Sequence, residues 1–373
     1  MTNSLHCPMI HGGLNLYLKE KSGDVCFNQC CLSTKSTVKL DQNLWDHPVL
    51  LELRANNNAE KWDRDCWECE RLENSGKRSF RQAMTDAFGK VDNLSGPKRI
   101  DLLFDRSCNI ACVTCGPHSS STWQKYIRDN HIPIENNFVN TTTINKVYET
   151  LDKMDLSHME MIQYCGGETL LGNTYWKVTE YIANKLPNAK KNLTLAFQTN
   201  GTQTIDAKYY DLIEKFHLVK FMISLDGTQE RFNYLRWPAN WNQVVDNIFS
   251  LKEKLPVNVM FFIQETTSNL NLYYYNEVKS WMEKHFNVNR VTDPIEHSTQ
   301  LAMHRFLNVN NITNEYYEYM QSTEIKGIFS NNWKENKEMI GVFLREMENF
   351  DRFRGLDWKK TFPEVANFYS KYL

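Results

Sequence analysis

The sequence lacks the long apolar run that a membrane span requires. No stretch approaches about 20 consecutive apolar residues, and residues 1–7 lack the basic and apolar regions of a signal peptide. An excess of one charge is also missing, because 43 Lys and Arg stand against 45 Asp and Glu, for a net charge of −2. We therefore expect a cytoplasmic protein with no membrane association, and no nucleic acid partner is indicated.

Cysteine is missing from the second half of the chain, since none occurs between residue 166 and residue 373. In a reducing cytoplasm, cysteines serve more often as metal ligands or catalysts than as disulfides. Such an uneven distribution therefore indicates ligand groups. The ten cysteines are Cys7, Cys26, Cys30, Cys31, Cys66, Cys69, Cys108, Cys112, Cys115 and Cys165.

One group of cysteines has the spacing C-x3-C-x2-C. Cys108, Cys112 and Cys115 follow directly on an apolar run that reads as a strand. Three thiolates in one loop can hold three irons of a [4Fe–4S] cluster and leave the fourth iron open to a substrate or cofactor. The alternative is a zinc knuckle with His118 as the fourth ligand, because structural zinc sites close with four protein ligands.

A second group of cysteines lies nearer the N-terminus. Cys66 and Cys69 form a C-x2-C pair, with Cys7 and the adjacent Cys30 and Cys31 upstream. A C-x2-C pair with a second cysteine group indicates a metal site. The alternative, a redox dithiol, would require a strand–CxxC–helix context that the sequence does not provide here.

From about residue 96, strand-length apolar runs alternate with helix-length amphipathic segments, which predicts a parallel sheet covered by helices. The expected strands are residues 99–104, 159–164, 193–199, 219–225, 257–263 and 288–291. Six units are too few for a closed eight-stranded barrel. We expect an α/β fold with a partial, TIM-like (β/α)6 barrel over residues 96–300, a cysteine-rich domain over 1–95 and a helical extension over 301–373.

Polar residues follow the second, third and fourth expected strands. They are Gly166, Gly167, Glu168, Asn200, Ser224, Asp226 and, further on, Arg236. Each has a plain reading as a turn residue, a helix cap or a solvated charge. However, the carboxyl ends of parallel strands share one rim, so we expect these side chains to gather beside the three-cysteine loop (residues 108–115).

Four motifs in this order resemble those of the radical S-adenosylmethionine (SAM) enzymes. They are the three-cysteine loop, Gly166-Gly167-Glu168, Thr199-Asn200-Gly201 and Ser224-Leu225-Asp226-Gly227. The SPASM/twitch branch is the most similar, over roughly residues 97–295. The sequence departs from the family at Thr114, where an aromatic residue is usual, and at Thr169, where proline is usual.

The resemblance implies a role for each matched residue. Cys108, Cys112 and Cys115 would ligate a [4Fe–4S] cluster, and SAM would bind its open iron. Gly166, Gly167 and Glu168 would hold the SAM ammonium. Asn200 and Ser224 would lie near the ribose or methionine part, with Asp226 in the same motif, and Arg236 would pair with the SAM carboxylate.

The N-terminal cysteines resemble the auxiliary-cluster ligands of twitch domains. This resemblance implies a second [4Fe–4S] cluster held by Cys7, Cys31, Cys66 and Cys69, with Cys30 a close rival to Cys31 and Cys26 a further candidate. In most of the branch this module follows the barrel, whereas here it would precede the barrel.

The implied activity is reductive cleavage of SAM to a 5′-deoxyadenosyl radical that abstracts hydrogen from a peptide or protein side chain. A flavodoxin or ferredoxin would be the reducing partner. The alternative within the family is oxidation of a sugar, cyclitol or other small molecule. The alternative of a different class is a zinc-stabilised binding protein without radical chemistry.

Overall fold

The computed structural model is built around one curved sheet whose described strands run in the order β3-β2-β1-β4-β5-β6-β7-β8-β9. The structure describes residues 4–18, 24–33, 38–39, 44–92, 94–130, 144–286, 295–301, 306–329 and 333–373. The strands are β1 (Gly13–Leu18), β2 (Val25–Asn28), β3 (Val38–Lys39), β4 (Arg99–Asp105), β5 (Met161–Gly166), β6 (Thr194–Thr199), β7 (Leu218–Ser224), β8 (Val259–Thr267) and β9 (Ile295–Leu301). β1 and β4 to β9 form a parallel ladder, and β2 and β3 add antiparallel strands at one end.

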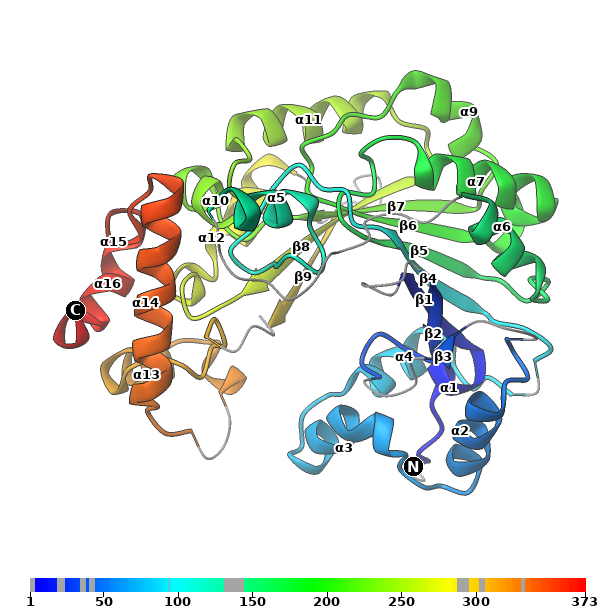
Figure 1. The fold of residues 1–373 in the computed structure, drawn as a ribbon, viewed down its shortest axis with the longest axis horizontal. Coiled ribbons are helices and arrows are strands. Elements are labelled where there is room, and N and C mark those ends of the chain that lie inside the picture. The colour runs from blue at the N-terminus through cyan, green and yellow to red at the C-terminus, as the bar shows by residue number, and fades with distance from the viewer. Residues whose placement is uncertain are drawn as a thin grey trace.

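Helices cover the convex face of the sheet, where α6, α7, α9 and α11 lie in Figure 1. Outward-facing side chains such as Leu102, Phe197 and Phe221 are fully buried beneath them. The helices are α1 (Pro8–Gly12), α2 (Pro48–Asn58), α3 (Trp67–Asn74), α4 (Phe80–Phe88), α5 (Ser121–Asp129), α6 (Ile144–Asp152), α7 (Thr174–Lys185), α8 (Ala189–Asn192), α9 (Tyr210–Ile213), α10 (Gln229–Leu235), α11 (Trp241–Lys254), α12 (Glu277–His285), α13 (Asn314–Gln321), α14 (Lys337–Arg354), α15 (Trp358–Thr361) and α16 (Pro363–Phe368). Within the part of the chain that the structure describes, no helix combines the length and apolarity needed to cross a bilayer.

The predicted α/β partial barrel is confirmed, but the sheet contains one more parallel strand than expected. β4 to β8 overlap the first five expected strands, whereas residues 288–291 lie outside the described residues and the strand paired with β8 is β9. The additional strand is β1, which pairs in parallel with β4. The pairing begins with Gly13 opposite Arg99. Its Leu14, Leu16 and Leu18 are fully buried, and their alternation with polar residues is typical of a strand.

The described apolar side chains form two cores. The larger core lies between the sheet, its helices and the N-terminal elements. The second core belongs to the C-terminal helical unit (residues 306–373), which stands at the β8–β9 end of the sheet in Figure 1. This second core also contains Ala111 and Val113 of the three-cysteine loop and Trp123 of α5. The loop therefore packs against the C-terminal unit as well as against the barrel.

Candidate active site

The three-cysteine loop begins just after β4 and ends before α5, and hydroxyl groups at the start of α5 hold its first half. The Ser121 hydroxyl accepts the Cys108 backbone N–H at 3.0 Å, and the Thr122 hydroxyl donates to the Cys108 carbonyl at 2.6 Å. Ser120 caps α5 and also donates to the Ile110 carbonyl at 2.7 Å. The Ser-Ser-Thr run therefore fixes the loop and starts the helix at the same time.

The second half of the loop is held by the end of α10 and the residues that follow it. The Ala111 N–H donates to the Trp237 carbonyl and the Val113 N–H to the Leu235 carbonyl, both at 2.7 Å. On the other side, the Trp123 indole N–H donates to the Cys112 carbonyl at 2.9 Å. Sequence reasoning did not identify these supports, because they depend on contacts between residues far apart in the chain.

The three thiols occupy a buried environment that opposes their ionisation. Burial, and then the neighbouring Cys112, raises the pKa of Cys108 and of Cys115 to about 12. Burial also raises the pKa of Cys112, although Arg236 opposes this shift. Metal binding requires thiolates, so this loop needs a positively charged centre to hold three ionised cysteines together. An iron–sulfur cluster or a metal ion meets that requirement.

Glu168 lies fully buried after β5, where internal donors orient its carboxylate. Oε1 accepts from the Thr199 hydroxyl at 2.6 Å and from the Leu170 N–H at 3.0 Å, and Oε2 accepts from the Asn200 N–H at 2.6 Å. Burial raises the pKa of Glu168, and these hydrogen bonds oppose the shift by favouring the carboxylate. One acceptor position on Oε2 is left for a further donor, such as an ammonium group.

Gly166 and Gly167 let β5 approach the backbone that leads into the three-cysteine loop. A Cβ atom at Gly166 would lie 2.3 Å from the Asp105 carbonyl oxygen, and one at Gly167 would lie 2.2 Å from the Ser107 carbonyl oxygen. The Glu168 N–H donates to the same Ser107 carbonyl at 2.8 Å. The two glycines therefore bring Glu168 to the rim beside the cysteines.

Two of the predicted site residues reach the cysteine sulfurs themselves. The Asn200 side-chain amide lies 3.8 Å from Cys108 Sγ and donates to Asn109 Oδ1 at 3.0 Å. Arg236 Nη1 lies 3.8 Å from Cys112 Sγ, and Nη2 lies 2.8 Å from Asp226 Oδ2. Burial would lower the pKa of Arg236, but Asp226 and Cys112 outweigh burial and raise it.

The remaining rim residues lie beside this group. β7 ends at Ser224, opposite Gln264 of β8, and Ser224 is buried. Asp226 Oδ1 accepts the Thr266 N–H at 2.8 Å. The N-cap position of α10 belongs to Thr228 rather than Asp226. The loops after β4, β5, β6 and β7 thus meet at one rim, as the order of the motifs predicts.

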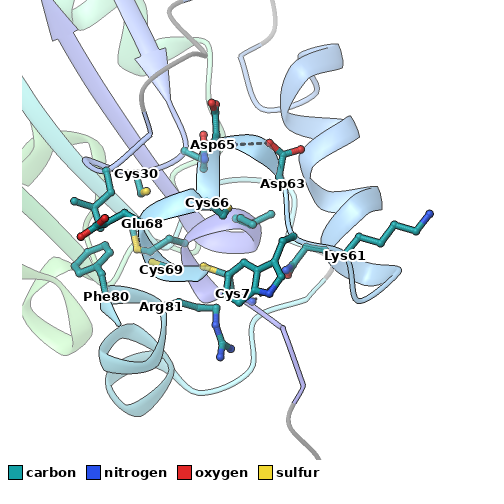
Figure 2. A pocket seen from close by; sticks show the side chains of 16 residues that line it. Cys7, Cys30, Lys61, Asp63, Asp65, Cys66, Glu68, Cys69, Phe80 and Arg81 are labelled. Carbon is teal, nitrogen blue, oxygen red and sulfur yellow. Dashed lines mark hydrogen bonds between the residues drawn. The ribbon is translucent and has the colours of Figure 1, made fainter. Parts of the chain in front are cut away.

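A second group of cysteines surrounds a pocket in the N-terminal region, shown in Figure 2. Cys7, Cys30, Cys66 and Cys69 line this N-terminal cysteine pocket together with apolar side chains such as Phe80. Burial raises the pKa of Cys7 to about 11 and that of Cys66 to about 12. Burial also raises the pKa of Cys30, and the neighbouring Cys31 and then Cys7 and Cys66 raise it further.

The other two N-terminal cysteines lie elsewhere. Cys31 is exposed and is not among the residues that line the pocket. Cys26 lies on β2, is 1% exposed and does not line the pocket either. The geometry therefore favours Cys30 over Cys31 as the fourth member of this group, a distinction that two adjacent cysteines in a sequence do not reveal.

Comparison with known proteins identifies one matching family. Residues 102–270 match the model of the radical SAM superfamily. No curated protein matches the chain. Native anSMEcpe with bound AdoMet is 17% identical, with 69% of this chain and 62% of that chain covered and a TM-score of 0.40. Streptococcus suis SuiB bound to precursor peptide SuiA is 11% identical, with 89% and 60% covered and a TM-score of 0.37. The chain thus spans about three fifths of the length of these solved structures.

Proposed function

Since residues 102–270 match the model of the radical SAM superfamily, we propose that the chain is a radical SAM enzyme in which Cys108, Cys112 and Cys115 hold the [4Fe–4S] cluster that binds SAM. The observation that carries this proposal is the convergence of the buried Cys112 and the partly buried Cys108 and Cys115 with Glu168, Asn200 and Arg236 at one rim. When bound, the cluster and SAM would supply radical chemistry: one electron from the reducing partner would be used to cleave SAM into methionine and a 5′-deoxyadenosyl radical able to abstract hydrogen from a substrate.

The polar residues of the rim have separate tasks in this proposal. Glu168 offers the free acceptor position of its carboxylate to the SAM ammonium. The hydrogen bonds that the carboxylate accepts from Thr199, Leu170 and Asn200 keep it in place. Asn200 and Arg236 direct N–H groups at Cys108 and Cys112 and so stabilise these sulfurs as thiolates. Arg236 already pairs with Asp226. In this proposal its guanidinium mainly stabilises the Cys112 sulfur, and a contact with the SAM carboxylate would come in addition to these two.

The N-terminal cysteine pocket fits a second [4Fe–4S] cluster with four protein ligands, Cys7, Cys30, Cys66 and Cys69. Cys7, Cys30 and the Cys66–Cys69 pair come from three separate segments and line one pocket, which supports their grouping around one centre. Full ligation suits electron transfer rather than substrate binding. A flavodoxin or ferredoxin is the expected source of the reducing electron.

We propose a peptide or protein side chain as the substrate. The concave face of the sheet supports this choice, because it carries the side-chain amides of Gln198 and Gln264 on β6 and β8. The Gln198 amide donates to Gln264 Oε1 at 3.3 Å. Amide side chains offer a donor and an acceptor together, as a peptide backbone requires.

The test begins with anaerobically reconstituted protein. We expect about eight irons and eight sulfides per chain, and release of 5′-deoxyadenosine on reduction with SAM. Cys112→Ala should abolish this release and keep about four irons in the N-terminal cysteine pocket. Colourless protein that carries only zinc would overturn the proposal.

Deuterium transfer then tests the substrate class. The enzyme is supplied separately with perdeuterated peptides and with perdeuterated sugars and cyclitols, and 5′-deoxyadenosine is analysed by mass spectrometry. Deuterium acquired from peptides supports the proposal. Deuterium acquired only from the small molecules favours the alternative oxidation of a sugar or cyclitol.

A further inference from the structure

The C-terminal helical unit contributes one charged side chain to the three-cysteine loop. Arg354 is the last residue of α14, and the left-handed Gly355 (φ 66°) ends the helix directly after it. Its Nη2 donates to the Ala111 carbonyl at 2.9 Å. The family match ends at residue 270, so this contact comes from outside the matched domain.

Three aromatic rings enclose the Arg354 guanidinium. Its central carbon lies 4.6 Å from the ring centre of Phe350, 5.0 Å from that of Trp123 and 5.3 Å from that of Trp237. Trp123 also donates to the Cys112 carbonyl, so the same ring contacts the guanidinium and the loop. Cation–π contacts hold the charge in place but do not neutralise it.

Among the described residues, no carboxylate forms an ion pair with Arg354, and its Nε and Nη1 are buried with no acceptor. The side chain is only 8% exposed. Asp351, one turn earlier on α14, is already engaged by the Tyr234 hydroxyl at 2.8 Å and the Trp358 N–H at 2.9 Å. An uncompensated buried charge destabilises the folded protein, and the carbonyl end of α14 offsets only part of this penalty.

An anionic centre at the cysteines would compensate this charge. Burial lowers the pKa of Arg354, and Tyr234, Tyr126, Cys112 and Asp351, in that order, act in the opposite direction. Arg236 approaches the same cysteine but already pairs with Asp226. Of these two arginines, Arg354 is therefore the one whose charge still lacks a carboxylate.

The geometry points to Arg354 as a positioning residue that clamps the Ala111–Cys112 segment and places a buried positive charge beside the cluster, so that the reduced state of the cluster is stabilised. This inference rests on the proposed function. Reduction adds one negative charge to the centre, and a fixed nearby cation in a water-poor site favours that added charge. The C-terminal unit would then set how readily the cluster accepts its electron.

The test is an electron paramagnetic resonance redox titration of reconstituted holoenzyme. The cluster held by Cys108, Cys112 and Cys115 is recognised by the change in its signal when SAM is added. Arg354→Met removes the charge and the donor, Arg354→Gln removes the charge and keeps a donor, and Arg354→Lys keeps the charge. Arg345→Met is the matched control, because Arg345 is an exposed residue of the same helix.

We expect both neutral variants to lower the midpoint potential, with about tenfold less reduced cluster at a fixed applied potential. Arg354→Lys should stay close to wild type, and Arg345→Met should match it. The inference is overturned if Arg354→Gln retains its iron with an unchanged midpoint, or if Arg354→Lys shifts as far as the neutral variants. If Arg354→Met loses its iron, the comparison of Gln with Lys decides the role of the charge.

The two proposals fail in different ways. Wild-type protein without a SAM-responsive cluster would remove the proposed function and this inference with it. A SAM-responsive cluster whose midpoint is the same in the wild type and the neutral variants would remove only the role of Arg354.

Discussion

Replacing Glu168 by glutamine tests whether its carboxylate binds SAM or only supports the rim. The substitution keeps the shape of a side chain that is 2% exposed and turns one oxygen into an NH2 group. If Oε1 keeps the Thr199 and Leu170 donors, the new amide faces the Asn200 N–H, so that two donors oppose each other in a buried site. The two retained hydrogen bonds also lose the contribution of the charge.

These losses amount to about 3–5 kcal/mol, since a buried unsatisfied donor costs about 1–3 kcal/mol and each of the two charge-assisted bonds exceeds a neutral one by about 1 kcal/mol. The neutral glutamine avoids the cost of burying a charge, which offsets part of these losses. We therefore expect the free energy of unfolding to fall by about 2 kcal/mol. The lost pairing with the SAM ammonium should weaken SAM binding by about 10- to 100-fold.

Urea denaturation measures the first effect, and anaerobic calorimetric titration of reconstituted enzyme with SAM measures the second. Glu160→Gln is the control, because Glu160 is a half-exposed partner of Lys98 before β5, and its loss should cost less than about 1 kcal/mol without altering SAM affinity. If Glu168→Gln is destabilised but binds SAM within about twofold of wild type, Glu168 only supports the Thr199–Asn200 turn and the ligand role is refuted.

Two further predictions concern the cysteine pocket and the glycines. Cys30→Ala should lower the iron content from about eight to about four per chain, whereas Cys31→Ala should leave it near eight, as measured by iron and sulfide analysis; the reverse result would exchange their roles. Gly166→Ala, with φ 126° and a Cβ 2.3 Å from the Asp105 carbonyl oxygen, should cost about 3 kcal/mol or more in urea denaturation. Gly172→Ala, with φ 79° and open space, should cost only about 1 kcal/mol, and equal losses would contradict the steric argument.

The arrangement of the rim was predictable because it depends on local signals combined by one general rule. Each motif follows an apolar run that ends a strand, and parallel strands bring their carboxyl ends to the same edge. Hence Asn200 and Arg236, far from the cysteines in sequence, lie beside Cys108 and Cys112. The alternation of strand and helix also predicted the partial barrel and the positions of β4 to β8.

The remaining features depend on contacts that no local pattern encodes. β1 carries the alternation of a strand, but its partner β4 lies about 80 residues further on, so the sequence does not reveal that the N-terminal region joins the barrel sheet. The choice between Cys30 and Cys31 depends on which of two adjacent side chains turns towards the pocket. Arg354 resembles any arginine at a helix end until packing brings it to Ala111.

The pairing of β1 has a mechanical consequence for electron transfer. β1 is hydrogen-bonded on one side to β2 and on the other to β4, with register positions running from Gly13 to Tyr17 on the β4 side. Hinges form at loops or at element ends rather than through a continuous ladder. Cys30 follows β2, so the N-terminal cysteine pocket is joined at this point to the sheet that carries the rim, and the β1–β4 ladder limits how far an electron donor and acceptor held at the two places could move apart. Substrate entry, in turn, cannot rely on this N-terminal region swinging away from the barrel.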